Sequence, residues 1–230
     1  MVVLNSSSNS ARAICTSGRT AGRTARDNFE NILSTKTICA LGVHCLHGDR
    51  IRALPEKKQK QFRVACFTET PLDQLGTLLD VGFRKFQLEP YGFVFQRDYL
   101  CQKGAQPAIY INDYVPNRSR GAADCLFEIG VKNGFSGRTW PLLPLVNVMH
   151  DGYDFTWERE WRVIGDVDFQ FDDLAAVILP EDEYDLRDRM TRIGVPAIDP
   201  KWGYEKLVLE MASQQRSAKK AWKSAAVAKR

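Results

Sequence analysis

The chain has 230 residues, of which 44% are hydrophobic, so it is long enough to bury one substantial core. Its 32 lysines and arginines against 28 acidic residues give a net charge of only +4, too small to indicate a nucleic-acid-binding protein without a local cluster. No stretch reaches the roughly 18–20 apolar residues of a membrane helix, and the start lacks the apolar core of a secretory signal. We therefore expect a cytoplasmic protein of one domain with no membrane partner.

From Asp27, which with Glu30 forms a candidate capping box, apolar residues recur at helical spacing and predict a helix over 27–35. Before it, the sequence predicts either loose order or one short strand near Ala11–Thr16. Alternation, turn residues and helical spacing then predict, in chain order, a strand over 63–70, a helix over 71–83, a strand running into a short helix over 90–100, a strand over 108–113, a helix over 122–134, a strand over 154–165, a buried strand over 175–180 and a helix over 181–194.

Short strands and helices without regular βαβ alternation predict an α+β fold. We expect one domain over 28–210, between an N-terminal segment of 1–27 and a basic helix or tail of 211–230. A helix in that tail would bring four cations to one face: Arg216, Lys219, Lys220 and Lys223. This face is a candidate for binding nucleic acid or an acidic protein, and a solvated terminal helix is the alternative.

Six cysteines, at positions 15, 39, 45, 66, 101 and 125, are scattered without a Cys-x-x-Cys pair. Several stand in apolar runs, so we expect buried reduced thiols, in keeping with the cytoplasm. Four residues of zinc-binding type lie close together: Cys39, His44, Cys45 and His47. Their spacing matches no standard zinc finger or knuckle, so zinc is the weaker interpretation and we expect no metal.

The stretch DFTWEREWRV (154–163) combines the aromatic and branched content of a buried strand with four neighbouring charges. In one continuous strand Glu158, Glu160 and Arg162 would share one face, and two tryptophans with Arg159 the other, where Arg159 would be stacked or ion-paired. The two carboxylates would lie roughly 6.5–7 Å apart, close enough to raise each other's pKa unless Arg162 offsets the repulsion. The trio is a candidate site for a cationic or polyhydroxyl ligand, and a solvated ladder of charges is the alternative.

Other chemistries find little support in the sequence. There are only three histidines, no Gly-x-Ser-x-Gly elbow and no Gly-rich phosphate loop after a strand, which argues against a Ser/His/Asp hydrolase and a phosphate-cradling ATPase. A nuclease would need acids and histidines at metal-ligand spacing, and outside the acids already named none appear. The charged face of 154–163 remains the leading candidate for chemistry.

Three ordered stretches, ACFTETPLDQL (65–75), PYGFVFQRDYLCQKGAQPAIYI (90–111) and DFTWEREWRV (154–163), resemble the abortive-infection AbiGi-like family of bacterial anti-phage proteins. From the first stretch to the last, the match runs through the middle of the chain and spans about half of it. Such proteins look like distant relatives of the ADP-ribosyltransferase fold, in which two small sheets clasp NAD and a glutamate late in the chain is catalytic. The resemblance therefore implies a single α+β domain of two small, mostly antiparallel sheets with a cleft and peripheral helices.

Carried over by residue, the resemblance implies that Glu160 is catalytic and that Glu158 completes a Glu-x-Glu pair. Thr68 and Tyr91 would lie against the nicotinamide end of NAD, and Arg162 would hold a carboxylate or meet a phosphate. A plain strand threonine and a core or turn tyrosine are the alternatives for Thr68 and Tyr91.

One departure concerns the first strand of the family, which carries His-Phe-Thr and contacts the NAD ribose. The corresponding place here is Ile14-Cys15-Thr16, so Thr16 would join the NAD site without a histidine. Arg12 is one candidate to replace that histidine, and His44 or His47 is another. If none of them reaches the cleft, the protein would be a non-catalytic member.

The resemblance implies a function in antiviral defence, in a toxin–antitoxin or abortive-infection setting. We expect an effector that cleaves NAD as a glycosyltransferase-type enzyme and transfers ADP-ribose to a macromolecule. The alternative is an antitoxin or sensor of the same fold that binds nucleic acid or a cognate protein without catalysis.

Overall fold

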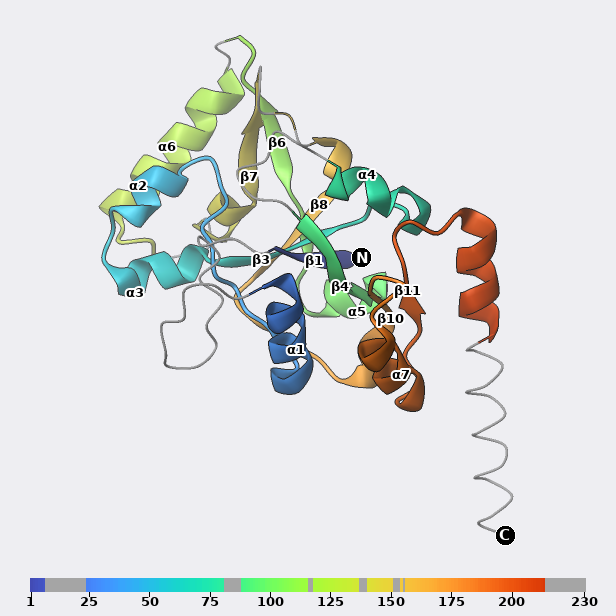
Figure 1. Cartoon of the computed structure of the whole chain (residues 1–230). Helices are drawn as coiled ribbons and strands as arrows, with labels where there is room; N and C mark the ends of the chain where they lie inside the picture. Colours follow the sequence, from blue (N-terminus) through green and yellow to red (C-terminus); the bar gives the residue numbers. More distant parts are fainter. Residues whose placement is uncertain are drawn as a thin grey trace.

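The structure is a computed structural model of the chain and describes residues 1–6, 24–80, 88–115, 118–136, 140–150, 154 and 156–213 (Figure 1). Its strands are β1 (Val2–Ser6), β2 (Thr37–Ile38), β3 (Val64–Thr68), β4 (Leu88–Phe95), β5 (Gln106–Pro107), β6 (Ile109–Asn112), β7 (Val146–Met149), β8 (Glu160–Ile164), β9 (Val167–Asp168), β10 (Leu174–Ile178) and β11 (Ala197–Ile198). Its α-helices are α1 (Ala25–Thr35), α2 (Gly48–Arg52), α3 (Glu56–Gln59), α4 (Leu75–Leu79), α5 (Arg97–Gln102), α6 (Arg118–Lys132) and α7 (Tyr184–Arg192), and residues 204–213 are also helical. Short 3-10 helices are η1 (Lys60–Phe62), η2 (Leu72–Gln74), η3 (Trp140–Leu145), η4 (Thr156–Glu158) and η5 (Phe171–Asp173).

Within the described residues, seven strands form one sheet in the order β11-β10-β4-β1-β3-β8-β5. All of its pairs are antiparallel except β10 with β11. Two short ribbons accompany it, an antiparallel one of β2 with β9 and a parallel one of β6 with β7. The mixed α and β content in one body agrees with the sequence, although one larger sheet and two ribbons replace the two small sheets that we expected.

The strand register decides which side chains share a face of the large sheet. Thr68 on β3 pairs with Glu160 on β8, and Cys66 pairs with Arg162 two positions along. Side chains that pair directly across two strands point to the same face. The face that carries Thr68 therefore also carries Glu160 and Arg162. The pair between them, Phe67 with Trp161, points to the opposite face.

The opposite face is covered by α1 and α7. Phe29 of α1 stacks on Phe93 of β4 at 4.6 Å between ring centroids, and Leu186 and Met190 of α7 join the same buried cluster. Helix α1 forms here because its apolar residues repeat at helical spacing, as the sequence predicts. Its N-cap is Thr24 rather than Asp27, whose carboxylate instead accepts from the Thr24 backbone N–H in a capping box.

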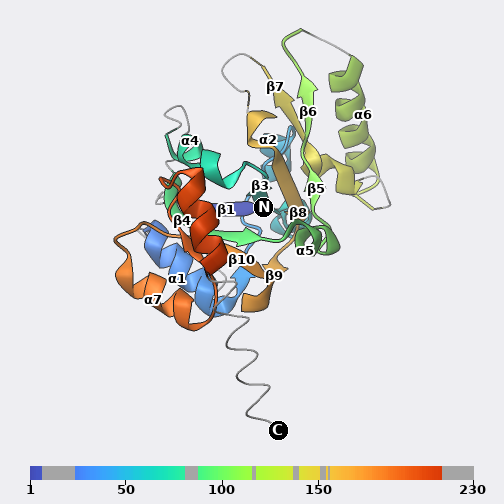
Figure 2. The same cartoon turned by 90° about the vertical axis from the view of Figure 1, so that its right-hand side faces the viewer.

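The Glu160 face is covered in two separate parts. Over β10, β4 and β1, an apolar cluster that includes Leu75 of α4 and Leu207 of the 204–213 helix packs on the sheet. Beside β3 and β8 stands a lobe made of α2, α3, α6 and the β6–β7 ribbon, whose own core includes Phe62 and Phe127. Figures 1 and 2 show this lobe at the opposite end of the molecule from α1 and α7.

Most of the predicted elements are confirmed. The helices around 27–35, 122–134 and 181–194 are present as α1, α6 and α7. The strands around 63–70, 90–95, 108–113 and 175–180 are present as β3, β4, β6 and β10, and the short helix that follows 90–95 is α5. The helix expected over 71–83 is shorter, since η2 and α4 end at Leu79.

The strand expected over 154–165 was only partly right. Residues 156–158 form the 3-10 helix η4, and the strand β8 starts only at Glu160. Between them Arg159 has a φ of 48°, in the left-handed region, which breaks the alternation of faces. Arg159 is consequently exposed and is not stacked within the strand beside the tryptophans as expected.

An N-terminal strand is present, at Val2–Ser6, where it pairs with both β3 and β4. The place at which we expected it, Ala11–Thr16, lies outside the described residues. The four cations predicted for a C-terminal helix, Arg216, Lys219, Lys220 and Lys223, also lie outside them. Among the helices that the structure describes, none has the length and apolar character needed to span a bilayer.

Candidate functional site

The centre of the charged face is a paired carboxylate and guanidinium on β8. Arg162 donates from Nε to Oε1 of Glu160 at 3.0 Å and from Nη2 to Oε2 at 2.8 Å, a two-point contact. The remaining Nη1 of Arg162 donates to the carbonyl of Pro144 in η3 at 2.7 Å. The Arg162 side chain is 1% exposed and that of Glu160 is 13% exposed. Such a nearly buried, two-point ion pair fixes the carboxylate in one orientation.

Two further donors meet the same carboxylate from neighbouring strands. The Tyr110 hydroxyl of β6 donates to Oε2 of Glu160 at 2.9 Å. The Cys66 thiol of β3, which lies opposite Arg162 in the register, is also hydrogen-bonded to Glu160. We call the set of Cys66, Thr68, Tyr110, Glu160 and Arg162 the Glu160 cluster.

Burial and pairing act on the titration of the Glu160 cluster in opposite directions. Burial alone would raise the pKa of Glu160, but the Arg162 charge and the hydrogen bonds from Arg162, Cys66 and Tyr110 outweigh it and hold the pKa below its usual value. Burial and the adjacent Glu160 charge raise the pKa of Cys66 well above its usual value, and they also raise that of Tyr110. At neutral pH Glu160 and Arg162 are therefore charged, and Cys66 and Tyr110 are neutral. Because Cys66 is protonated, it is not a nucleophilic thiolate.

Solvent reaches the Glu160 cluster although it lies on interior strands of the sheet. Cys66, Thr68 and Tyr110 are half-buried. On the opposite face of the same strands, Phe67 is 2% exposed and Val163 is 3% exposed. The face of β3 and β8 that carries the Glu160 cluster is therefore partly exposed around a buried Arg162, whereas the opposite face is closed.

Thr68 and Glu158 meet at the edge of the cluster. The Thr68 hydroxyl donates to the backbone carbonyl of Glu158, and its Oγ1 lies 2.8 Å from Oγ1 of Thr70. The charge of Glu158, whose side chain is half-buried in η4, also acts on Cys66 and Tyr110. The fold thus brings Glu158, Glu160, Thr68 and Arg162 together, although Glu158 is held by a turn and not by the strand.

His44 lies beside the cluster and was one of the residues considered for the missing histidine. Its ring is exposed, but the surrounding protein, and after it the charge of Arg162, lowers its pKa, with Glu160 opposing. A Cβ on Gly42 would lie 1.9 Å from Nε2 of His44, so the ring rests directly over the Gly42 backbone. His47 points elsewhere, because its ring is buried against Phe127 at 4.6 Å and its Nε2 is 3.2 Å from the Ala123 carbonyl of α6.

Tyr91 does not join this group of residues. It lies on β4 and packs against Phe29 of α1, with ring centroids 6.3 Å apart, on the face of the sheet opposite Glu160. Its hydroxyl donates to Glu183 at the start of α7. The placement is that of a half-buried packing residue, so the expected grouping of Tyr91 with Thr68 is not found.

Arg12 and Thr16, the other two residues that the resemblance assigns to NAD, lie outside the described residues. The described part of the chain contains no cluster of three or more histidine, cysteine or acidic side chains that could hold a metal ion. Cys45 and Cys66 are half-buried free thiols, and Cys101 and Cys125 are exposed free thiols. Cys39 is disulfide-bonded, which corrects the expectation that the cysteines are buried and reduced.

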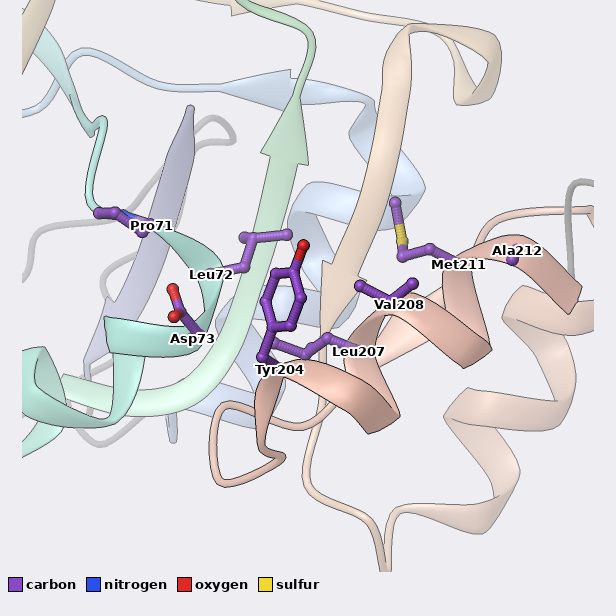
Figure 3. Close-up of a pocket in the computed structure, with 8 residues that line it drawn as sticks. All are labelled: Pro71, Leu72, Asp73, Tyr204, Leu207, Val208, Met211 and Ala212. Atoms are coloured by element: carbon purple, nitrogen blue, oxygen red, sulfur yellow. The ribbon is translucent and has the colours of Figure 1, made fainter.

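A separate groove of about 480 Å³ lies on the same side of the sheet but at its other end. Figure 3 shows it between the segment Pro71–Asp73 and one side of the 204–213 helix, with Tyr204 standing over Leu72. Its lining is apolar apart from Asp73 and the Tyr204 hydroxyl, and no member of the Glu160 cluster lines it. A groove without paired titratable groups offers no chemistry of its own, so we place the candidate site at the Glu160 cluster.

Tyr110 and Cys66 are the members of the cluster that the sequence did not single out. Both stand in stretches on which the resemblance is based, Cys66 in 65–75 and Tyr110 in 90–111. Cys66 alternates with the core residues Ala65 and Phe67 and is two positions from Thr68, so period two alone places it on the Thr68 face. No local pattern signals that Tyr110 turns toward Glu160.

Comparison of the chain with family models, with curated proteins and with solved structures gave no match in any of the three.

Replacing Tyr110 by phenylalanine should lower the free energy of unfolding by about 1–2 kcal/mol, because one hydrogen bond to a charged group is lost. The ring stays in place, so the change isolates the 2.9 Å contact with Glu160. Chemical denaturation at pH 7 measures the loss. Tyr204→Phe, at an exposed ring, is the matched control and should change little. Equal losses in the two variants would mean that the Tyr110 contact contributes nothing specific.

Proposed function

We propose that the protein is an anti-phage effector that cleaves NAD and transfers ADP-ribose to a macromolecule, with Glu160 as the catalytic carboxylate. The observation that carries the proposal is an ionised carboxylate, fixed by Arg162 and Tyr110, beside a part of the sheet face that solvent reaches. The reaction itself is taken from the resemblance of three sequence stretches to AbiGi-like proteins.

The proposed reaction breaks the bond between C1′ of the ribose and the nicotinamide nitrogen. The electron pair of that bond leaves with the nicotinamide, and positive charge develops on the ribose. A carboxylate held in position stabilises that charge only as it forms, which favours the transition state over the bound substrate. An oxygen or nitrogen of the acceptor then bonds to C1′ and gives up its proton. In this scheme Arg162 and Tyr110 are positioning residues.

The contacts of Glu160 define how a substrate would meet it. Both carboxylate oxygens already accept hydrogen bonds from Arg162, and further bonds come from Tyr110 and Cys66. A ribose hydroxyl would take the place of the Cys66 or the Tyr110 donor, both of which belong to half-buried residues. Thr68, at the same edge, would supply a further hydroxyl.

A second candidate function is a non-catalytic antitoxin or sensor of the same fold. The observation that favours it is the same set of four donors, because a carboxylate whose acceptor positions are all used serves equally well as a structural ion pair. Expression in bacteria separates the two candidates. An effector should slow growth and be rescued by Glu160→Gln, whereas an antitoxin or sensor should be tolerated.

Glu160→Gln should reduce nicotinamide release by about 10²–10³-fold, the usual cost of removing one electrostatic stabiliser of a transition state. The assay incubates purified protein with labelled NAD and cell lysate and follows both nicotinamide and labelled macromolecules. Glu205→Gln, an exposed acid on the 204–213 helix, is the control.

Since Glu160→Gln leaves Arg162 without its partner, thermal unfolding of each variant must first show that it is folded at the assay temperature. Absence of nicotinamide release by wild-type protein would end the catalytic proposal. Equal release by folded Glu160→Gln would remove Glu160 from it.

A further inference from the structure

The segment 48–63, which contains α2, α3 and η1, carries a local excess of positive charge. Between residues 48 and 63 six lysines and arginines stand against two acids, Asp49 and Glu56. Six cations less two acids give this segment a formal charge of +4, which equals the net charge of the whole chain. Such a cluster gives a mildly charged protein a local electrostatic footprint.

The cations of this segment lie at the surface, and we call their exposed side chains the α2–α3 surface. The side chain of Arg50 is 46% exposed and pairs with Glu128 of α6, and that of Arg52 is 56% exposed and pairs with Asp49. Lys57 and Lys60 are exposed and make no ion pair with any residue that the structure describes. Ion pairs in open water are weak, so even the paired arginines can exchange their partners for a ligand phosphate.

The backbone under these cations is fixed by packing. Ile51 of α2 and Phe62 of η1 are fully buried, and the Phe62 ring meets Phe135 edge-on at 4.9 Å. The Lys58 ammonium is anchored to the Gly134 carbonyl at the end of α6. The buried side chains of α2 and η1, on either side of α3, thus hold the charged segment in one arrangement.

The α2–α3 surface is connected to the Glu160 cluster by the segment 42–47. Gly42 pairs with Val64 of β3, and the Arg52 guanidinium donates to the Val43 carbonyl at 3.2 Å. His44, which follows, has an exposed ring that feels the charges of Arg52, Arg162 and Glu160. The segment 42–47 therefore joins the α2–α3 surface to the border of the candidate site.

We infer that the α2–α3 surface binds the phosphate backbone of a nucleic acid. A docking protein would require exposed apolar or aromatic anchors at the centre of its interface. None of the exposed large hydrophobic side chains found in the described chain lies between residues 48 and 63. A surface of cations without apolar anchors suits a polyanion, and phosphates are bound by such charges with release of counterions.

The inference names a substrate class for the candidate site as well, and this part rests on the proposed function. A nucleic acid that lies along the α2–α3 surface passes His44 and reaches the border of the Glu160 cluster. It would then be the acceptor of ADP-ribose. Binding itself needs no NAD, so it is measured separately from transfer.

The test compares full-length protein with the double variant Lys57→Gln plus Lys60→Gln. Binding of fluorescent 20-nucleotide single-stranded DNA and RNA is followed by anisotropy between 50 and 300 mM NaCl without NAD. The dissociation constant should rise on the order of tenfold at 100 mM salt, and the steepness of log K against log salt should fall by about 1.4, for two phosphate contacts on a single strand.

The control double variant is Lys103→Gln plus Lys201→Gln, which removes the same charge from exposed lysines outside the surface. Residues 214–230 are unchanged in all three proteins, so their contribution cancels. Equal weakening in the two double variants, or no nucleic-acid binding at all, overturns the inference. Displacement of the DNA by polyglutamate at the same charge concentration overturns it in favour of an acidic protein. Loss of NAD cleavage with binding retained ends only the proposed function.

Discussion

Replacing Arg162 by alanine is expected to lower the free energy of unfolding by about 3–5 kcal/mol at pH 7, because it leaves a nearly buried carboxylate without its charge partner. The Arg162 side chain is 1% exposed and that of Glu160 is 13% exposed, so water cannot fully replace the guanidinium. The Pro144 carbonyl loses its donor in the same change. Urea denaturation at pH 7 measures the loss.

The effect of Arg162→Ala should depend on pH. In the wild type the pKa of Glu160 is below its unfolded value, so the stability that its ionised form contributes is present above the unfolded pKa and is lost as the pH falls through the folded pKa. In the variant, burial without the guanidinium raises the pKa of Glu160, and protonation relieves the unpaired charge as the pH falls. The difference between the two proteins should therefore shrink from pH 7 toward pH 4.

Arg192→Ala is the matched control for Arg162, because Arg192 also pairs with an acid but lies 74% exposed on α7. It should leave the unfolding free energy nearly unchanged at every pH. A loss at Arg162 no larger than the loss at Arg192 would mean that the buried pair and its contact with Pro144 of η3 contribute no more to stability than an exposed ion pair. A pH-independent loss would mean that Glu160 does not respond to its partner.

Phe93→Ala should cost a similar amount, about 3–5 kcal/mol, for a different reason. Phe93 is fully buried at the centre of the sheet and stacks on Phe29 at 4.6 Å, so truncation leaves a cavity under α1. No charged group is uncovered, and the loss should stay the same between pH 7 and pH 4. Differential scanning calorimetry and urea denaturation at both pH values measure it.

Phe93 also separates stability from chemistry, because it points away from the Glu160 face. Below its unfolding temperature Phe93→Ala should retain the nucleic-acid affinity of the wild type and any NAD cleavage. Loss of either function in folded Phe93→Ala would show that the two faces of the sheet are coupled. Val94→Ala is the control on the same strand. Val94 is the next residue and points to the Glu160 face, so its truncation leaves a smaller cavity on that face.

The elements that could be predicted from the sequence are those whose signals are local. Helix α1 has apolar residues at helical spacing, and β10 is a short apolar run between turns. Strand β1 was not predicted, because its five residues have no alternation of their own and are held between β3 and β4 by long-range pairing. The two-residue strands β5 and β11 likewise exist only through their partners.

In the candidate site, too, only the residues that share one strand could be placed from the sequence. Glu160 and Arg162 are two residues apart in one strand, so period two alone places them together. Tyr91 and Thr68 stand on β4 and β3, which both pair with β1. Whether their side chains point to the same face depends on the register of these two pairings, and no local sequence pattern predicts that register. Glu158 left the strand because Arg159 takes a left-handed φ, and the charged sequence around it gives no sign of that.

Arg162 and Tyr110 also determine how far the elements around the Glu160 cluster can move when a ligand binds. The Glu160 carboxylate is joined to η3 through the Arg162 guanidinium and to β6 through the Tyr110 hydroxyl. Both η3 and β6 are therefore linked to the same strand, β8. Separating these elements would leave the Glu160 carboxylate, which is 13% exposed, without some of its donors. We therefore expect the lobe to move little when a ligand binds, so that the ligand must fit the arrangement that is already present.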